Sequence, residues 1–343
     1  MTFEAVLAAL ANGGEGATQG VGEGVGAILD GHWNEAQIAA FLGAVRVYGG
    51  TPACIARAAF VLRQHMIPVA HSLPLVVDTC GTGGDGAHTL NLSTGAALVV
   101  AALGVPVAKH GNRSVSSRCG SADVLEAMGV ALQVPATSQT AVLDECGIAF
   151  LMAPAHHPAL KHAARVRKEL GVRTLFNGLG PLANPAGATH QVLGVYDDSY
   201  RQTAAQVLRE LGSTRAWVVH SEDGMDELSP SAPTRITELR NGLLSEMSLA
   251  PEDFGLERLP RQAYDGGDAP HNAKALLQIL SGATHPATDA VVLAAAAALV
   301  VAQDLSPKDA AARARQCLAS GQAMRAFERF AACTQSIVAG PRP

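Results

Sequence analysis

The amino-acid sequence predicts an α/β protein that combines a small α-helical domain with a larger domain built on a mostly parallel central sheet. Helical periodicity runs through the first part of the chain, which makes residues 1–70 the helical domain. In residues 71–343, short apolar segments alternate with helical segments, a pattern typical of parallel strands covered on both faces. The length of 343 residues is enough for about two domains of roughly 150 residues.

The composition indicates a folded protein and disfavours a general nucleic-acid binder. Apolar residues make up 48% of the chain and charged residues 16%, which excludes a disordered chain and a coiled coil. Lys and Arg number 25 against 30 Asp and Glu, so the net charge is −5. With only 4% aromatic residues, neither a basic surface nor a stacking platform for single strands is indicated.

The cysteines and the apolar runs predict a cytoplasmic protein with reduced thiols. No two of the six cysteines have C-x-x-C spacing, so neither a zinc site nor a thioredoxin-like motif is indicated. The first ten residues contain Glu4 and no basic residue, unlike a secretory signal. The longest apolar run, residues 290–302, is shorter than the about 20 residues of a membrane span, and we expect a buried helix there.

In the N-terminal domain, capping residues and periodicity locate two helices. Asn34 and Gln37 have the spacing of a capping box, and the apolar residues that follow at positions 38, 41, 42 and 45 share one helical face. Thr51 and Pro52 are a cap and a first-turn proline for the next helix. The glycine-rich residues 13–26 are expected to form a loop.

The second domain is expected to alternate strands and helices. Strands are predicted at residues 75–77, 105–108, 147–153, 191–196 and 216–220, and helices at residues 94–103, 121–128 and 199–211. Residues 235–239 and 243–247 flank Asn241-Gly242, the preferred turn of a β-hairpin. Ser306 and Pro307 begin what we expect to be the last helix, an amphipathic one.

Three polar segments are expected at the carboxyl edge of the sheet. Residues 81–86 are rich in glycine, which lets backbone N–H groups approach an anion closely. Residues 91–94 place polar side chains at a helix start, where N–H groups and the helix dipole favour phosphate. Residues 109–117 form a polar, basic loop after the next strand. Because open α/β sheets bind ligands at this edge, the set predicts a site for a polyphosphorylated small molecule; the alternative is a solvated surface.

Two further segments add charged groups. Asp226 and Glu227 follow a strand, and such oxygen ligands suit Mg²⁺ beside phosphates, although an acidic turn is the alternative. Arg165 and Arg167 lie about 200° apart on one helix, so at most one of them points into a given cleft, where it would bind a carboxylate. The alternative for these arginines is a solvated basic face. His156-His157 has no acidic partner nearby in the sequence, which favours packing or hydrogen bonding over metal binding.

Together these segments resemble the anthranilate phosphoribosyltransferases, enzymes of tryptophan biosynthesis. The resemblance extends in order over nearly the whole chain, through residues 78–86, 91–94, 109–117, 120–126, 173–177, 180–185 and 223–227. It implies a nucleoside phosphorylase/phosphoribosyltransferase-like fold, with the helical domain completed by about residues 165–190, and a homodimer. The implied reaction joins anthranilate to the phosphoribosyl group of phosphoribosyl pyrophosphate (PRPP) and releases pyrophosphate.

The resemblance also implies a set of site residues by position. For PRPP these are Gly81, Gly84, Asp85, Thr89, Asn91, Leu92, Ser93, Thr94, Lys109, His110, Gly111, Asn112, Arg113, Ser114, Val115, Ser116, Ser117 and Ser121. For anthranilate they are Gly81, Asn112, His157 and Arg167, and for Mg²⁺ they are Ser93, Asp226 and Glu227. No side chain is expected to act as acid or base, because the aromatic amine of anthranilate is already neutral at pH 7.

Departures from the family pattern and two rival functions remain open at this point. The chain has residues 45–50 in place of a Met-Arg-x-Lys-Gly-Glu-like segment, and it has Leu90, His271 and Ala294 where Phe, Glu and Asn are usual. A nucleoside phosphorylase-like enzyme would also cleave at ribose C1, but its Lys-x-Ser-x-x-x-Gly-like segments are not visible. A non-catalytic relative that binds nucleic acid would be expected to carry more basic charge.

Overall fold

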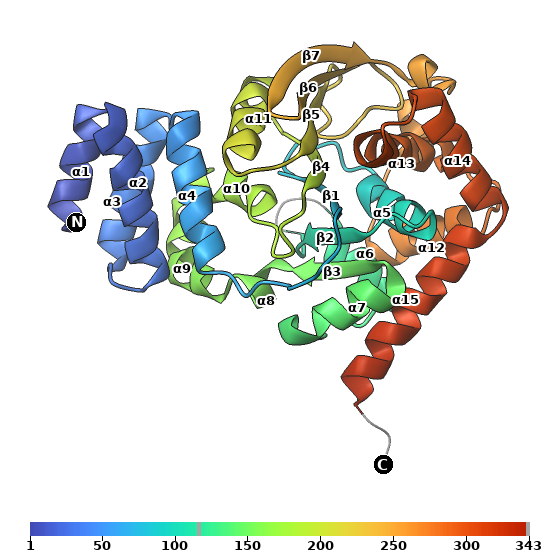
Figure 1. Cartoon of the computed structure of the whole chain (residues 1–343), viewed down its shortest axis with the longest axis horizontal. Coiled ribbons are helices and arrows are strands. Elements are labelled where there is room, and N and C mark those ends of the chain that lie inside the picture. Colours follow the sequence, from blue (N-terminus) through green and yellow to red (C-terminus); the bar gives the residue numbers. More distant parts are fainter. Residues whose placement is uncertain (115–117, 341–343) are drawn as a thin grey trace.

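The computed structural model describes residues 1–114 and 118–340. A bundle of N-terminal helices lies at one end of the molecule, and a seven-stranded sheet with its covering helices forms the rest (Figure 1). This is the predicted combination of a small helical domain with a larger α/β domain.

The N-terminal bundle consists of α1 (Phe3–Asn12), α2 (Gly14–Leu29), α3 (Glu35–Tyr48) and α4 (Pro52–Gln64). The predicted capping box is confirmed, because Asn34 Oδ1 accepts the Gln37 N–H at 3.0 Å and Gln37 Oε1 accepts the Asn34 N–H at 3.1 Å. The Thr51 hydroxyl caps α4 by accepting the Cys54 N–H. The predicted apolar face of α3 is buried.

The expectation of a loop at residues 13–26 is wrong, because nearly all of this stretch belongs to α2. Its glycines serve close packing between helices. A Cβ on Gly24 would lie 2.4 Å from the ring of Phe41 in α3, and a Cβ on Gly22 would lie 2.7 Å from the side chain of Arg57 in α4. Tertiary contacts therefore outweigh the low helix propensity of glycine.

The sheet has the strand order β3-β2-β1-β4-β5-β6-β7. Its members are β1 (Val77–Gly81), β2 (Val107–Gly111), β3 (Ile148–Met152), β4 (His190–Gly194), β5 (Arg215–Ser221), β6 (Thr234–Arg240) and β7 (Leu243–Leu249). The first five are parallel, and β6 and β7 add the predicted hairpin at one edge in antiparallel pairing. The turn residues Asn241 and Gly242 have φ of 50° and 80°, as an Asn-Gly hairpin turn requires.

The first two strands lie further along the chain than predicted. The apolar runs suggested residues 75–77 and 105–108, whereas β1 continues to Gly81 and β2 to Gly111. Polar residues occupy buried strand positions here because they have partners inside the protein. Asp78, for example, is fully buried and accepts hydrogen bonds from the Asn184 side chain and the His110 N–H.

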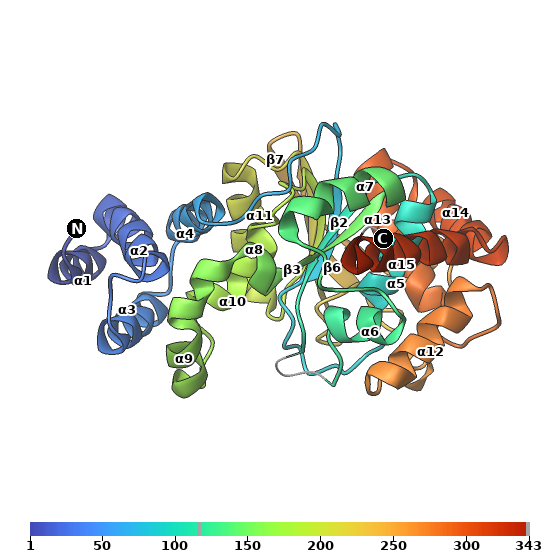
Figure 2. The same cartoon turned by 90° about the horizontal axis from the view of Figure 1, so that it is seen from below.

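Helices cover both faces of the sheet (Figure 2). On one face α5 (Leu92–Ala102) and α13 (Thr288–Gln303) contact the central strands, and on the other face lies α11 (Arg201–Glu210). Further helices of this domain are α6 (Ser121–Ala127), α7 (Gln139–Cys146), α12 (Ala269–Leu280), α14 (Pro307–Ala319) and α15 (Gln322–Ala339). The predicted buried helix at residues 290–302 is confirmed within α13.

Helix α14 begins with the predicted Ser306 cap, but it is not the last helix, because α15 follows it after a short turn around Gly321. Among the helices in the described part of the chain, none is by itself long and apolar enough to cross a membrane. Within the described residues, α13 and α14 meet the length and composition criteria only when they are taken together, as a pair bent by 120°.

The segment after β3 returns the chain to the helical bundle. It comprises α8 (Ala153–His156), α9 (Lys161–Leu170) and α10 (Leu175–Leu179), and α9 contacts α2 and α3 while α10 contacts α3 and α4. One apolar cluster extends from the bundle through α9 and α10 to the sheet face under α11. Because this apolar cluster is continuous, it does not mark a boundary between the domains. The boundary at residue 70 and the completion of the helical domain by about residues 165–190 therefore stay predictions.

Candidate active site

The buried amine of Lys109 joins the ends of β1 and β2 to the start of α5. Its Nζ donates to the Thr79 carbonyl at 2.5 Å and to the Ser93 hydroxyl at 3.3 Å. Burial lowers the pKa of Lys109, while the nearby carboxylates of Asp78 and Glu227 favour its charged form. The structure thus brings a cation and the first turn of α5 together at the carboxyl edge of the sheet.

The glycine-rich loop, residues 81–86, folds over the same edge. Gly83, Gly84 and Gly86 have φ between 65° and 80°, which residues with a Cβ rarely adopt. Gly81 lacks room for a side chain, since a Cβ there would lie 2.8 Å from Asp226 Oδ2. The same Oδ2 atom accepts the Gly83 N–H at 2.8 Å, so the loop is seated directly on one of the predicted metal ligands.

Three acidic side chains, one of them from this loop, converge at the same edge of the sheet. Asp85 Oδ2 accepts the Asp226 N–H at 3.2 Å. Burial raises the pKa of Asp226 well above its usual range, and the neighbouring carboxylates of Asp85 and Glu227 raise it further. Burial also raises the pKa of Glu227 to about 7. Packing acidic groups this closely is unfavourable unless a cation or protons neutralise them.

These residues fit a divalent cation. Glu227 Oε2 is buried without a hydrogen-bond partner among the described residues, and the Ser93 hydroxyl lies close enough to favour the ionised Glu227. Carboxylate and hydroxyl oxygens are suitable Mg²⁺ ligands. Within residues 1–114 and 118–340, no three His, Cys, Asp or Glu side chains are already arranged as a metal cage. Mg²⁺ in proteins often takes its remaining ligands from water and from substrate phosphates.

The residues at the start of α5 have different surroundings. The Asn91 side chain does not cap the helix but donates to the Cys119 carbonyl at 3.1 Å and accepts from the Asn272 side chain at 2.9 Å. The Thr94 hydroxyl is buried without a partner among the described residues. Leu92 is fully buried, which leaves only its backbone to face a ligand. The backbone of Thr89 pairs with that of Asp265 in an isolated antiparallel β-bridge beside this helix start.

The third predicted segment, residues 109–117, is partly described. His110 is buried, and its Nδ1 lies 3.0 Å from the Gly180 carbonyl. The Arg113 guanidinium contacts the carboxylates of Asp123 and Glu126, while Asn112 is exposed and its carbonyl accepts from Ser121. Gly111 has no space for a Cβ, and Ser114 donates its N–H to Asp123. The predicted site residues Val115, Ser116 and Ser117 lie outside the described residues.

The two arginines of α9 have different surroundings. Arg165 is exposed and pairs with Glu35 and Glu169. Arg167 is half-buried, without a carboxylate partner among the described residues, and its guanidinium carbon lies 5.5 Å from the centre of the Phe176 ring. Burial lowers the pKa of Arg167. An unpaired, partly desolvated guanidinium is suited to bind a carboxylate.

Buried histidines from two different segments pack together. The rings of His110 and His157 are 5.2 Å apart. Burial lowers the pKa of His110 to about 3 and that of His157 to about 4, so both imidazoles are neutral at pH 7. His156 packs beside them with its Nδ1 at 2.8 Å from the Ile67 carbonyl, in line with packing rather than metal binding.

Several residues around the site were not predicted to be site residues from the sequence. Asp78 and Asn184 form a buried pair beneath Lys109 at 2.7 Å, and the Asn272 amide orients Asn91. Arg173 donates to the Gly84 carbonyl at 2.5 Å, although its segment was noted only as part of a motif. A buried Asp in a strand is a detectable signal, whereas the positions of Asn272 and Arg173 depend on contacts between distant segments.

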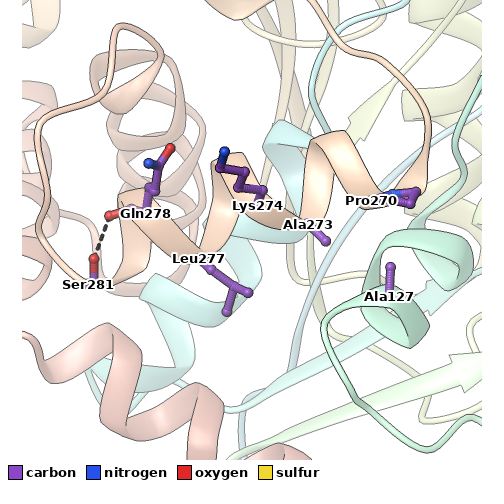
Figure 3. A pocket seen from close by; sticks show the side chains of 7 residues that line it. All are labelled: Ala127, Pro270, Ala273, Lys274, Leu277, Gln278 and Ser281. Carbon is purple, nitrogen blue, oxygen red and sulfur yellow. Dashed lines mark hydrogen bonds between the residues drawn. The ribbon is translucent and has the colours of Figure 1, made fainter.

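A separate surface groove of about 650 Å³ lies along α12 (Figure 3). It is lined by Ala127, Pro270, Ala273, Lys274, Leu277, Gln278 and Ser281. The groove shares no residue with the candidate site and has one charged side chain, so it lacks the converging polar groups of a catalytic centre.

Comparisons with known proteins assign the chain to a family. Residues 5–66 match the helical bundle domain of a glycosyl transferase family, and residues 73–324 match its a/b domain. The anthranilate phosphoribosyltransferase of Symbiobacterium thermophilum is 49% identical over 304 residues, 88% of this chain and 89% of the relative. That of Thermomicrobium roseum is 47% identical over 94% of both chains.

Solved structures agree with these relatives. The anthranilate phosphoribosyltransferase of Thermus thermophilus has a TM-score of 0.90 and 41% identity, over 97% of this chain and 99% of that one. The enzyme of Saccharomyces cerevisiae in complex with PRPP and Mg has a TM-score of 0.86 and 28% identity, over 93% of both chains. The chain described here therefore belongs to the anthranilate phosphoribosyltransferase family.

Proposed function

We propose that this protein transfers the phosphoribosyl group of PRPP to anthranilate, yielding N-(5-phosphoribosyl)anthranilate and pyrophosphate in tryptophan biosynthesis. The observation that supports this best is that one molecule contains two different candidate sites, one for a metal-bound pyrophosphate and one for a carboxylate. Lys109 and the buried carboxylates suit a magnesium pyrophosphate, and the unpaired Arg167 suits a small carboxylate. The named relatives favour this transferase over a nucleoside phosphorylase and over a non-catalytic nucleic-acid binder.

PRPP is proposed to bind at the carboxyl edge of the sheet. The backbone of residues 81–86 and the first turn of α5 would supply N–H donors, and Lys109 would supply positive charge. The unpartnered Thr94 hydroxyl is one group that a phosphate oxygen would satisfy. The full set proposed for PRPP remains the one implied by the resemblance, including residues 115–117.

Mg²⁺ is the proposed cofactor, held by Ser93, Asp226 and Glu227. The support is the unpartnered Glu227 oxygen and the crowding of acidic groups, together with the Mg in the Saccharomyces complex. When bound, the ion would neutralise charge on the leaving pyrophosphate. Because the pKa of both carboxylic acids is raised by burial, cation binding would have to displace protons from them near neutral pH.

Anthranilate is proposed to bind between the helical bundle and the sheet, near Gly81, Asn112, His157 and Arg167. The Arg167 guanidinium would hold the carboxylate and thereby point the amine toward ribose C1. Neutral imidazoles at His110 and His157 fit this arrangement, because they add no charge that would compete with Arg167 for the carboxylate.

The chemistry is a displacement at ribose C1. The amine lone pair forms the new C–N bond while the C1–O bond breaks and its electron pair leaves with pyrophosphate. Charge develops on the leaving group, where Lys109 and the loop N–H groups would stabilise it. The nitrogen then loses a proton to water, and no strong base is required because the attacking amine is neutral. Positioning and charge neutralisation therefore account for the catalysis.

A homodimer and a cytoplasmic location complete the proposal. The helical bundle exposes two large apolar side chains, Val47 at 89% and Phe60 at 45%, which a partner subunit would cover. Light scattering tests the dimer, and the Val47→Asp variant is expected to shift the mass toward that of one chain.

The reaction itself is tested by mixing the protein with anthranilate, PRPP and Mg²⁺ and following anthranilate fluorescence. We expect the fluorescence to fall with time. A well-folded sample that leaves it unchanged at saturating substrate concentrations would contradict the proposed function.

A further inference from the structure

Arg173 connects the helical bundle to the glycine-rich loop, residues 81–86. Its guanidinium donates to the Gly84 carbonyl at 2.5 Å, and the guanidinium carbon lies 3.6 Å from the centre of the Tyr196 ring. Its own carbonyl accepts a hydrogen bond from the Arg46 side chain of α3 at 2.6 Å. One residue between α9 and α10 therefore contacts both the bundle and the predicted phosphate-binding loop.

The loop needs such a contact because its glycine-rich sequence does not by itself favour a single conformation. Glycine loses more conformational freedom on folding than any other residue, and this loop has a glycine at four of its six positions. The α/β domain restrains one side of the loop, where Thr82 donates its N–H to the Gly194 carbonyl and Gly83 donates to Asp226. The hydrogen bond from Arg173 restrains the loop from the side of the helical bundle.

The fit between loop and guanidinium is close. A Cβ on Gly84 would lie 2.8 Å from Arg173 Nη2, so glycine at this position makes room for the arginine. Tyr196 provides the flat surface on which the guanidinium stacks, and its own N–H donates to the Thr82 hydroxyl at 3.0 Å. A planar cation that stacks and donates at once is a property of arginine that lysine lacks.

We propose that Arg173 is a positioning residue for the reaction, which holds the glycine-rich loop in its phosphate-binding conformation before PRPP arrives. It acts through Gly84 and does not itself touch the substrate. A loop ordered in advance spares PRPP binding the entropy cost of ordering it. This inference rests on the proposed function, because it assumes that residues 81–86 bind the pyrophosphate.

The expected kinetic effect is confined to one substrate. Arg173→Ala should raise the KM for PRPP about tenfold, which corresponds to one charge-assisted hydrogen bond, while kcat and the KM for anthranilate stay near their wild-type values. Arg173→Lys should recover part of the loss, since lysine reaches the carbonyl without stacking. Tyr196→Leu should raise the KM for PRPP by a smaller factor, and Tyr196→Phe, which keeps the ring, should behave as wild type.

Hydrogen exchange supplies a second readout that does not depend on turnover. In the absence of substrates, the amides of residues 82–87 should exchange faster in Arg173→Ala than in wild type, with unchanged exchange in the central strands. Arg258→Ala is the matched control, because Arg258 is an exposed arginine paired with Glu252 outside the site, and its removal should change neither readout.

The outcomes separate the inference from the proposed function. If wild type consumes anthranilate but Arg173→Ala keeps the wild-type KM for PRPP, the inference is overturned while the function stands. Equal losses for both substrates, together with a lower melting temperature, would likewise overturn it, because Arg173 would then be merely structural. If wild type is inactive, the proposed function fails, and unchanged loop exchange in Arg173→Ala would independently reject the role of Arg173.

Discussion

Gly83 donates its backbone N–H to Oδ2 of Asp226 at 2.8 Å, across 143 positions of sequence. This bond joins the loop after β1 to the acidic turn after β5. It places the proposed phosphate-binding backbone against the proposed Mg²⁺ ligand, as expected if pyrophosphate and its cation bind together. The predictions below test this arrangement and the packing that supports it.

The carboxylate pair is expected to set the metal requirement. Asp226→Asn combined with Glu227→Gln removes two charges from the proposed Mg²⁺ site, so the Mg²⁺ concentration for half-maximal activity should rise. The fold should persist, because both replacements keep size and polarity, and circular dichroism checks this. A double variant with wild-type Mg²⁺ dependence would mean that these side chains form only an acidic turn.

Arg167 is expected to determine the affinity for anthranilate. Loss of one charge-assisted hydrogen bond costs about 1.5–3 kcal/mol, so Arg167→Ala should raise the KM for anthranilate roughly ten- to a hundredfold. The KM for PRPP should change little, since the phosphates are assigned to other groups. Steady-state kinetics with each substrate varied in turn provide the measurement.

Arg165→Ala is the control for Arg167 on the same helix. Arg165 is exposed and pairs with Glu35 and Glu169, and exposed ion pairs contribute little, so both KM values should stay near wild type. A larger anthranilate defect in Arg165→Ala than in Arg167→Ala would show that the wrong face of α9 has been assigned to the site.

The buried imidazole of His157 is expected to make the fold sensitive to acid. Burial, with a smaller contribution from the nearby His156, lowers its pKa from 6.5 to about 4. Below pH 6.5, His157 therefore binds a proton in the unfolded chain but stays neutral in the folded chain. The free energy of unfolding falls as the pH drops toward about 4. Above pH 6.5, His157 is neutral in both the folded and the unfolded chain, and its full contribution to stability is present.

A His157→Gln variant isolates this contribution from that of the other titrating groups. Urea unfolding of wild type and variant is compared between pH 7.5 and pH 4. The stability advantage of wild type, whatever its size at neutral pH, should shrink as the pH falls through this window. A difference between the two proteins that is independent of pH would contradict the buried, neutral state of His157.

The glycines of α2 provide a test of helix packing. A Cβ on Gly24 would lie 2.4 Å from the Phe41 ring, so Gly24→Ala should destabilise the protein by about 1–3 kcal/mol through overpacking. Gly16 lies in the same helix with no atom within 4 Å of an added Cβ, and Gly16→Ala should stabilise by about 0.5–1 kcal/mol. Thermal unfolding that changes in the same direction for both variants would refute this packing.

Local patterns were sufficient to predict much of the fold. Asn34 with Gln37, Thr51 with Pro52, and Asn241 with Gly242 act through contacts between near neighbours, and each forms the predicted cap or turn. The apolar run at residues 290–302 was also predictable, because a segment of this composition is stable only when it is buried on all sides.

The errors arose where distant contacts override local preference. Nearly all of residues 13–26 is helical because close packing against Phe41 and Arg57, which requires glycine at these positions, outweighs the low helix propensity of glycine. Strand β1 continues into polar residues because Asn184 satisfies Asp78. Within the site, the order of polar loops after parallel strands predicted that residues 91–94 and 109–117 would lie at the same edge of the sheet, where Lys109 now contacts Ser93. The contact of Arg173 with Gly84 could not be predicted, since it joins segments 89 positions apart through one side chain.

The most direct test of the central claim is the stoichiometry of the reaction. Protein, anthranilate, PRPP and Mg²⁺ are incubated, and anthranilate consumed and pyrophosphate released are measured in the same samples, with parallel samples that lack Mg²⁺ or contain inorganic phosphate in place of anthranilate. The account predicts equal amounts of the two, dependence on Mg²⁺, and no pyrophosphate release beyond background with phosphate as the acceptor. Pyrophosphate release without loss of anthranilate, or no turnover by well-folded protein, would contradict it.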